Sequence, residues 1–227
     1  MRSESEIEKK ARTGRDGADP ETSVEPGTDG WAILPLTREQ VRTIRFLLQA
    51  ETDSNPRDLA LFCTAIDTML RASDLLSLSV ADVTDHTGIV RDEFPVKQRK
   101  TGNGTIVGIT PETRAAIDRW ITYAGRLRWQ PLFSGRRGGP GSEWSDAPLS
   151  KVQYRTLIKK WVAAARLDPA DYSSHSLRRT KAAIIYEKTK DIESVRELLG
   201  QRSVSATSVY LNISKRQALD LAKTITI

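Results

Sequence analysis

The chain has 227 residues, with 35 Lys and Arg against 29 Asp and Glu, and its formal net charge is +6. This length supports a real hydrophobic core in one large domain or two small ones, and no apolar run approaches the ~20 residues of a membrane span. A start without an apolar segment, a single Cys63 and only two His predict a cytoplasmic protein with no secretory signal, disulfide framework or metal site.

Charge is distributed unevenly along the chain. Residues 1–30 carry five basic and eight acidic residues and are rich in Gly, Ser, Thr and Pro. Such a segment cannot bury enough apolar surface to offset its ordering entropy, so we predict a disordered acidic N-terminal tail. Residues 97–160 instead carry thirteen basic and four acidic residues. This block suits either contact with a polyanion or a solvated basic face, and charge alone does not separate the two.

Residues 31–227 are predicted to fold, mostly as helices. Three helix starts carry residue pairs with capping-box spacing: Thr37 with Gln40, Ser150 with Gln153, and Ser214 with Gln217. Apolar residues at helical spacing predict amphipathic helices over 57–70 and 151–166, and the last capping pair predicts a C-terminal helix over 214–227. Trp120 and Trp161 lie on predicted helices, and we expect both in the core.

The middle of the chain has a different pattern. Short runs rich in β-branched and aromatic residues lie within 87–109, and Gly102-Asn103-Gly104 is a strong hairpin signal. We therefore expect an α+β, mostly α-helical fold with a small three-stranded antiparallel sheet near 87–109. Residues 130–148 are rich in Gly, Pro and Ser, which predicts a surface loop.

Several short motifs follow one another in a characteristic order. An L-R-A-S-D-L-L segment contains Arg71, Lys100 precedes the hairpin turn, and an H-S-L-R segment contains His175 and Arg178. The L-L-G-Q segment ending at Gln201 and then Tyr210 complete the series. In this order and spacing, over residues 36–227, the sequence resembles the tyrosine recombinase (phage integrase) family.

The chemistry of such a site explains the residue types. Cleaving a DNA phosphodiester with a side chain requires a nucleophile that forms a stable ester, cations for the charge on the nonbridging oxygens, and a proton donor for the leaving oxygen. Arg binds phosphate oxygens bidentately and stays charged. Lys loses a proton more readily, which suits a general acid. Tyr has an unperturbed pKa near ~10, so it needs a cationic setting or a base.

The resemblance implies a role for each position. Tyr210 would attack to form a 3′-phosphotyrosyl bond, Arg71 and Arg178 would bind the scissile phosphate, and Lys100 would protonate the leaving 5′ oxygen. His175 would share the tyrosine proton, and as an i, i+3 neighbour of Arg178 at a helix start it can lie on the same face. The resemblance implies no metal, ATP or other cofactor, because the ester conserves the bond energy.

One position departs from the common family pattern. Gln201 stands where most members have His and some have Trp; its amide can donate to a phosphate oxygen but cannot exchange a proton near neutral pH. We therefore expect reduced or altered catalysis rather than none.

The same residues also have purely structural interpretations. Arg71 could balance the macrodipole at the end of the helix predicted over 57–70, His175 could bond locally at a helix start, and Tyr210 could be a core residue. The hairpin offers Lys97 and Arg99 as alternatives to Lys100.

Double-stranded DNA is the partner that the resemblance implies. Candidate DNA-binding residues, which would position the chain without reading sequence, are Lys97, Arg99, Arg136, Arg137, Lys151, Arg155, Lys159, Lys160 and Arg179. Few residues precede the region of resemblance, so the chain resembles small members with a catalytic domain only. We expect a homo-oligomer, a tetramer on DNA, with an accessory DNA-binding protein as a further partner, and association with the bacterial nucleoid.

Three functions follow from these observations. The first is a site-specific recombinase or integrase. The second is a catalytically weak or inactive DNA-binding protein on a recombinase fold, motivated by Gln201 and the short N-terminal region. The third, weaker one is relaxation of supercoiled DNA in the manner of a type IB topoisomerase.

Overall fold

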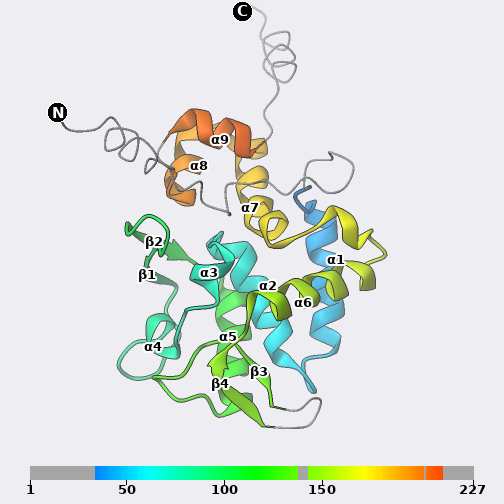
Figure 1. Cartoon of the computed structure of the whole chain (residues 1–227), viewed down its shortest axis with the longest axis vertical. Helices are drawn as coiled ribbons and strands as arrows, with labels where there is room; N and C mark the ends of the chain where they lie inside the picture. Colours follow the sequence, from blue (N-terminus) through cyan, green and yellow to red (C-terminus); the bar gives the residue numbers. More distant parts are fainter. Residues whose placement is uncertain (1–33, 138–142, 202, 212–227) are drawn as a thin grey trace, which may run out of the picture. The chain divides into compact units, whose positions relative to one another are not determined.

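The fold comes from a computed structural model that describes residues 34–137, 143–201 and 203–211, without the side chains of Ala206, Val209 and Tyr210. The predicted tail 1–30 and the predicted helix 214–227 lie outside the described residues. In chain order (Figure 1), the elements are α1 (Arg38–Ala50), α2 (Pro56–Thr68), α3 (Ala72–Leu75), α4 (Val80–Val83), β1 (Glu93–Lys97), β2 (Gly104–Gly108), α5 (Pro111–Ala124), β3 (Ser134–Arg136), β4 (Trp144–Pro148), α6 (Lys151–Ala164), the 3₁₀ helix η2 (Pro169–Asp171), α7 (Ser174–Thr189), α8 (Ile192–Leu199) and α9 (Val204–Tyr210). Within these ranges, no helix is both long and apolar enough to cross a membrane.

The predicted helix starts within the described residues are confirmed. Thr37 and Ser150 form complete capping boxes with Gln40 and Gln153, so the first turns of α1 and α6 satisfy their backbone donors locally. A proline opens both α2 and α5, where the missing N–H costs no helical hydrogen bond.

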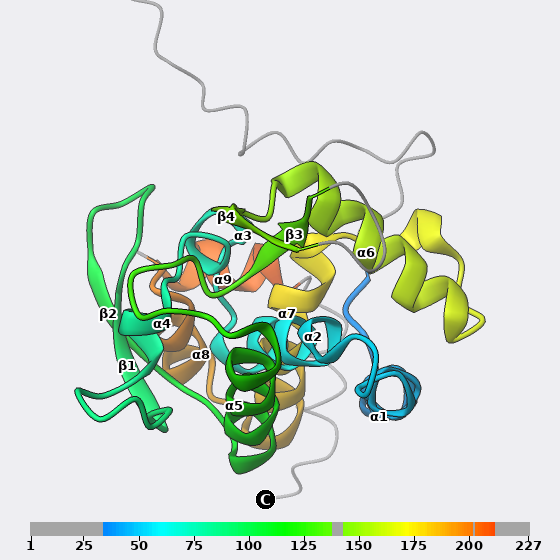
Figure 2. The same cartoon turned by 90° about the horizontal axis from the view of Figure 1, so that it is seen from below.

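Helix α2 is the centre of the core. All of its residues except Leu59 are buried, and it packs against α1, α5 and α7, which surround it in Figure 2. Trp120 of α5 and Trp161 of α6 are both buried, as predicted. The Trp161 indole donates to Asp58 Oδ2 at 3.1 Å and meets the Phe62 ring edge-on. A central helix buried on every side therefore fixes the positions of the elements around it.

The sheet predicted near 87–109 has two strands in place of three. β1 and β2 pair antiparallel, with Lys97 opposite Gly104 across the predicted hairpin turn. Residues predicted as a further strand make only an isolated bridge between Thr84 and Val90. The reason is local: the Asp85 carboxylate accepts the Thr87 and Ile89 amide hydrogens and so closes a tight turn.

The loop prediction for 130–148 is wrong in its described part. β3 and β4 pair antiparallel there, forming a second two-stranded sheet. Leu132 and Phe133 are fully buried, and the Leu132 carbonyl accepts the Trp120 indole N–H at 2.6 Å. These two apolar side chains anchor the segment to the core, whereas its Gly and Pro content alone suggested an irregular surface loop.

Candidate active site

Arg71 lies in a turn between two helices. α2 ends at Thr68 because Met69 adopts the left-handed conformation with φ 50°. Arg71 is the extended N-cap of α3, with φ −64° and ψ 150°. The alternative that Arg71 balances the macrodipole at the end of a helix over 57–70 is therefore wrong. Its half-buried side chain instead reaches toward the β1–β2 hairpin, where Nη1 donates to Gln98 Oε1 at 2.9 Å.

Arg178 connects three segments of the fold. Its residue is only 4% exposed, and a buried guanidinium requires hydrogen-bond acceptors. Nη1 donates to the carbonyl of Met69, in the turn that leads to Arg71, and Nη2 donates to the carbonyl of Leu199, the last residue of α8, at 2.8 Å. Arg178 thus ties the α2–α3 turn and the end of α8 to the first turns of α7.

Lys100 lies in the turn between β1 and β2. It is predicted to precede the hairpin turn, but β1 ends at Lys97, and Lys100 is exposed within the turn itself. The neighbouring Arg99 amide donates to Oδ1 of the buried Asp74 of α3 at 3.0 Å. This bond anchors the Lys100 turn beside the segment that carries Arg71.

Gln201 follows the end of α8. Gly200 caps this helix in the left-handed conformation, with φ 61°. The Gln201 carboxamide oxygen accepts a hydrogen bond from the buried Thr207 hydroxyl of α9 at 2.6 Å, and its backbone carbonyl accepts one from Arg196 Nη1 at 3.1 Å. These bonds fix the oxygen end of the amide and link α8 to α9.

His175 lies on α7, which also carries Arg178, and Tyr210 lies on α9, which packs against α8. His175 is exposed in the first turn of α7, where its amide donates to the Ser173 hydroxyl at 3.1 Å, and Arg178 lies one turn further on. Tyr210 is the last residue of α9, and its side chain lies outside the described part of the chain. The contacts described above bring together the segments of Arg71, Lys100, Arg178 and Gln201.

Sequence reasoning assigned no role to two polar residues at this junction, Asp74 and Gln98. Gln98 is only 2% exposed, and its Oε1 accepts hydrogen bonds from both Arg71 and Thr101. A signal was available: buried Phe94 and Val96 alternate along β1, and Gln98 continues their inward-facing register as a polar residue.

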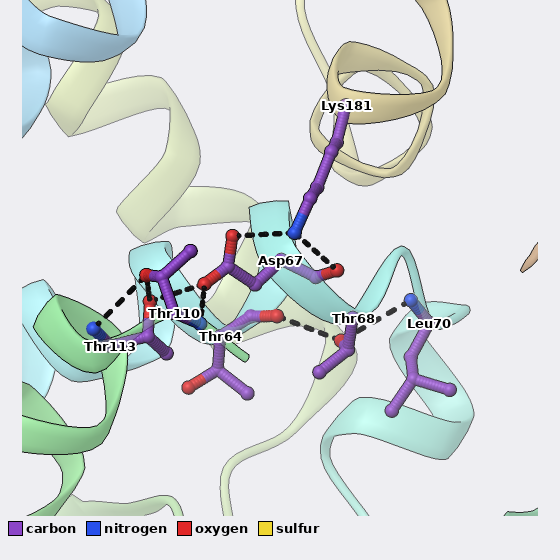
Figure 3. A network of polar contacts seen from close by, with 7 residues as sticks. All are labelled: Thr64, Asp67, Thr68, Leu70, Thr110, Thr113 and Lys181. Atoms are coloured by element: carbon purple, nitrogen blue, oxygen red, sulfur yellow. Dashed lines mark hydrogen bonds and ion pairs between the residues drawn. The ribbon is translucent and has the colours of Figure 1, made fainter. Parts of the chain in front are cut away.

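A second polar network joins α2 to α7 next to these residues (Figure 3). Asp67 Oδ2 accepts from the Thr113 hydroxyl at 2.6 Å and the Thr110 amide at 2.8 Å, and Oδ1 lies 2.9 Å from Lys181 Nζ. Burial alone raises the pKa of the Asp67 carboxyl, but the hydrogen bonds from Thr113 and Thr110 and the charge of Lys181 outweigh it and hold the pKa below its ordinary value. Asp67 is therefore an ionised link between α2, α5 and α7.

The candidate DNA-binding residues divide by element. Lys97 and Arg99 are exposed on the β1–β2 hairpin, Lys151 and Arg155 are exposed on α6, and Arg179 is half-buried on α7.

The remaining four candidates make contacts within the chain. The Arg136 guanidinium lies 4.2 Å from the centroid of the Trp144 ring, and Arg137 forms an ion pair with Asp146. On α6, Lys159 donates to the Pro169 carbonyl and Lys160 lies 3.7 Å from a Glu51 carboxylate oxygen. The β1–β2 hairpin and the exposed face of α6 thus present basic groups to solvent.

The sequence matches known proteins over most of its length. The profile of the phage integrase family matches residues 35–217. The chain is 26% identical over 217 residues to tyrosine recombinase XerD of Xanthomonas axonopodis pv. citri, covering 89% of this chain and 67% of that protein. It is 33% identical over 165 residues to tyrosine recombinase XerD of Corynebacterium glutamicum, covering 70% of this chain and 49% of that protein. The chain thus spans about half to two thirds of the length of these relatives.

Solved structures share the fold. XerH site-specific recombinase bound to its difH substrate superposes with a TM-score of 0.64 at 17% identity, covering 85% of this chain and 55% of that one. The Tn1549 transposon integrase in complex with circular intermediate DNA gives a TM-score of 0.65 at 16% identity, covering 87% and 69%. With the family profile matched over residues 35–217, the chain belongs to the phage integrase family, the tyrosine recombinases.

Proposed function

We propose that this protein is a site-specific DNA recombinase that cuts and rejoins strands through a covalent Tyr210–DNA ester. The observation that carries the proposal is the connected junction of Arg71, Arg178 and the Lys100 turn, joined through Gln98, Asp74 and the carbonyls of Met69 and Leu199. Family membership supports the reaction class, and the two XerD relatives are named as tyrosine recombinases.

The proposed step balances without an external energy source. The Tyr210 phenol oxygen attacks the scissile phosphorus, the P–O5′ bond breaks, and the DNA remains attached through its 3′ phosphate. Lys100 gives a proton to the leaving 5′ oxygen, while His175 shares the proton of the attacking phenol. The 5′ hydroxyl of a second strand then reverses the step, which releases Tyr210 and seals the new junction.

Arg71 and Arg178 stabilise the negative charge that builds on the phosphate during this reaction. The nonbridging oxygens gain negative charge as phosphorus becomes five-coordinate, and positioned guanidinium donors stabilise that charge more than they stabilise the ground state. Both side chains are held in place by hydrogen bonds to Gln98 Oε1 or to backbone carbonyls, so little reorganisation is needed at the moment of reaction.

Gln201 supplies a hydrogen-bond donor in place of a proton-exchanging group. The Thr207 hydroxyl donates to Gln201 Oε1, so the Nε2 donor end of this amide points away from Thr207. We expect this position to tune the rate and to be dispensable for the formation of the ester.

DNA is the proposed partner, bound by the basic groups on the β1–β2 hairpin and on α6. Among the structural neighbours, XerH is bound to difH substrate and a lambda integrase fragment is a dimer on a core site. By analogy we propose oligomeric assembly on paired DNA sites, up to a tetramer, with an accessory DNA-binding protein as a further partner.

The test is a search for the covalent adduct. The full chain is incubated with a pool of nicked duplexes of randomised sequence, in which the cleaved fragment diffuses away and traps the ester. The proposal predicts a protein–DNA band that resists denaturation, for the wild type and for the Gln201→Ala variant, and none for Tyr210→Phe. Equal adduct yields from the wild type and Tyr210→Phe would show that another residue attacks. Binding without any adduct would identify a DNA-binding protein that lacks strand chemistry.

A further inference from the structure

The Gln98 side chain lies where three parts of the candidate active site meet. It belongs to the β1–β2 turn that carries Lys100, its oxygen binds Arg71 at 2.9 Å, and its amide nitrogen lies against Gly200. A Cβ added to Gly200 would stand only 2.2 Å from Gln98 Nε2, closer than non-bonded atoms come. One buried carboxamide therefore touches the segments of Arg71, Lys100 and Gln201.

The chemistry of the amide suits this position. A carboxamide oxygen has two lone pairs, and here it accepts Arg71 Nη1 at 2.9 Å and Thr101 Oγ1 at 3.0 Å. The Gln98 backbone also closes the turn, donating to the Asn103 carbonyl at 2.9 Å and accepting the Gly102 amide at 2.8 Å. The neutral oxygen fixes the guanidinium without cancelling its charge, which leaves that charge available to a phosphate.

We propose that Gln98 is a positioning residue that sets Arg71 against the Lys100 turn and against Gly200–Gln201. The inference rests on the proposed function, because it assigns Gln98 an effect on the rate of strand cleavage through Arg71. A displacement of a catalytic group by about 1 Å can lower a rate about 100-fold, so loss of this contact should be visible in cleavage while the fold persists.

The first test compares Gln98→Met with the wild type on two substrates. Methionine has a similar length and volume but no oxygen to accept from Arg71. The two substrates are nicked duplexes of one sequence, selected by wild-type adduct formation. One has the ordinary phosphodiester at the scissile position, and the other has a neutral methylphosphonate there. The exposed Ile106→Ala, on β2 of the same hairpin, is the control for a nonspecific effect on this sheet.

The proposal predicts a substrate-dependent defect. On the diester, Gln98→Met should cleave about 10- to 100-fold more slowly than the wild type. The methylphosphonate lacks the charged oxygen that Arg71 would stabilise. On this substrate, the wild type and Gln98→Met should cleave at nearly the same rate. Ile106→Ala should match the wild type on both. An equal loss on both substrates, or no loss on either, would overturn the assignment.

A second variant, which retains the hydrogen-bond acceptor but adds a negative charge, protects the test against misfolding. Gln98→Glu keeps an acceptor for Arg71 and Thr101, but its negative charge competes with the phosphate for the guanidinium. It should also slow the diester reaction and spare the methylphosphonate reaction. A wild type that forms no adduct would overturn the proposed function together with this inference, whereas a reactive wild type with equally reactive Gln98 variants would overturn the inference alone.

Gly200→Ala approaches the same contact from the other side. The new methyl group would displace the Gln98 amide, and the left-handed φ of 61° adds backbone strain. The variant should show the same preference for the methylphosphonate, and Gly200→Ala combined with Gln98→Met should cost less than the product of the two separate losses. Fully multiplicative losses would show that Gly200 and Gln98 act independently.

Discussion

The Asp67 carboxylate and the Lys181 ammonium, 2.9 Å apart, join α2 to α7 one helical turn beyond Arg178. Thr110 and Thr113 bind the other carboxylate oxygen, so this single side chain aligns three helices (Figure 3). The turn of Met69 and Arg71 begins two residues after Asp67. We therefore expect the alignment of Arg71 with Arg178 to depend on the ionised Asp67.

Replacing Asp67 by Asn should lower stability in a pH-dependent way. The pKa of Asp67 lies below its ordinary value in the folded chain, so its ionised form stabilises the fold above the pKa of the unfolded chain, and this contribution is lost as the pH falls through the folded pKa. We expect Asp67→Asn to reduce the free energy of unfolding by about 1–3 kcal/mol near neutral pH, and by less under acid conditions. Urea unfolding at both pH values measures this, with the exposed Asp118→Asn of α5 as the matched control. A deficit that does not shrink in acid would contradict the account.

At the level of elements, periodicity and capping chemistry predicted α1, α2 and α6, because those signals are local. Thr37 and Ser150 cap the helices whose starts the sequence predicted. The β3–β4 pair was missed because it depends on burial of Leu132 and Phe133 against residues distant in the chain. In the candidate site, too, local motifs were predicted but contacts between distant segments were not.

Motif order placed Arg71, Lys100 and Arg178 on adjoining segments, but their packing was not predictable from local sequence. The left-handed Met69, which ends α2 early, carries no sequence signal of its own, since Gly or Asn is the usual residue there. Gln98 was overlooked because its importance lies in contacts with Arg71 and Gly200, which are far away in the sequence.

The N-terminus of α7 can be tested as an element. Ser173 accepts the His175 amide and the Ser176 hydroxyl accepts the Ser173 amide, which completes a capping box. Ser173→Ala should cost about 1 kcal/mol of unfolding free energy, whereas Ser173→Asn, which also caps, should cost little. Thermal or urea unfolding of the three proteins decides this. Equal losses for the two variants would show that Ser173 does not stabilise α7 by capping.

For the whole molecule, the net charge of +6 combines a negative segment at 1–30 with an excess of basic residues at 97–160. If the exposed face of α6 contacts phosphates, each contact adds to the salt dependence of binding. Replacing Lys151 and Arg155 together by Ala should weaken binding to a nonspecific duplex and reduce the slope of log affinity against log salt by about 2. Arg42→Ala, at an exposed position of α1, should leave the slope unchanged. A reduced slope for Arg42→Ala together with an unchanged slope for the Lys151 and Arg155 double variant would place the DNA on another face.

The central claim is that Tyr210 becomes esterified to DNA, and the most direct measurement is the identity of the linked residue. The trapped adduct is digested with protease and nuclease, and the peptide that retains a nucleotide is sequenced by mass spectrometry. The account predicts one modified peptide, with a nucleotide joined through its 3′ phosphate to the oxygen of Tyr210. A nucleotide on any other side chain, or a linkage through a 5′ phosphate, would contradict it.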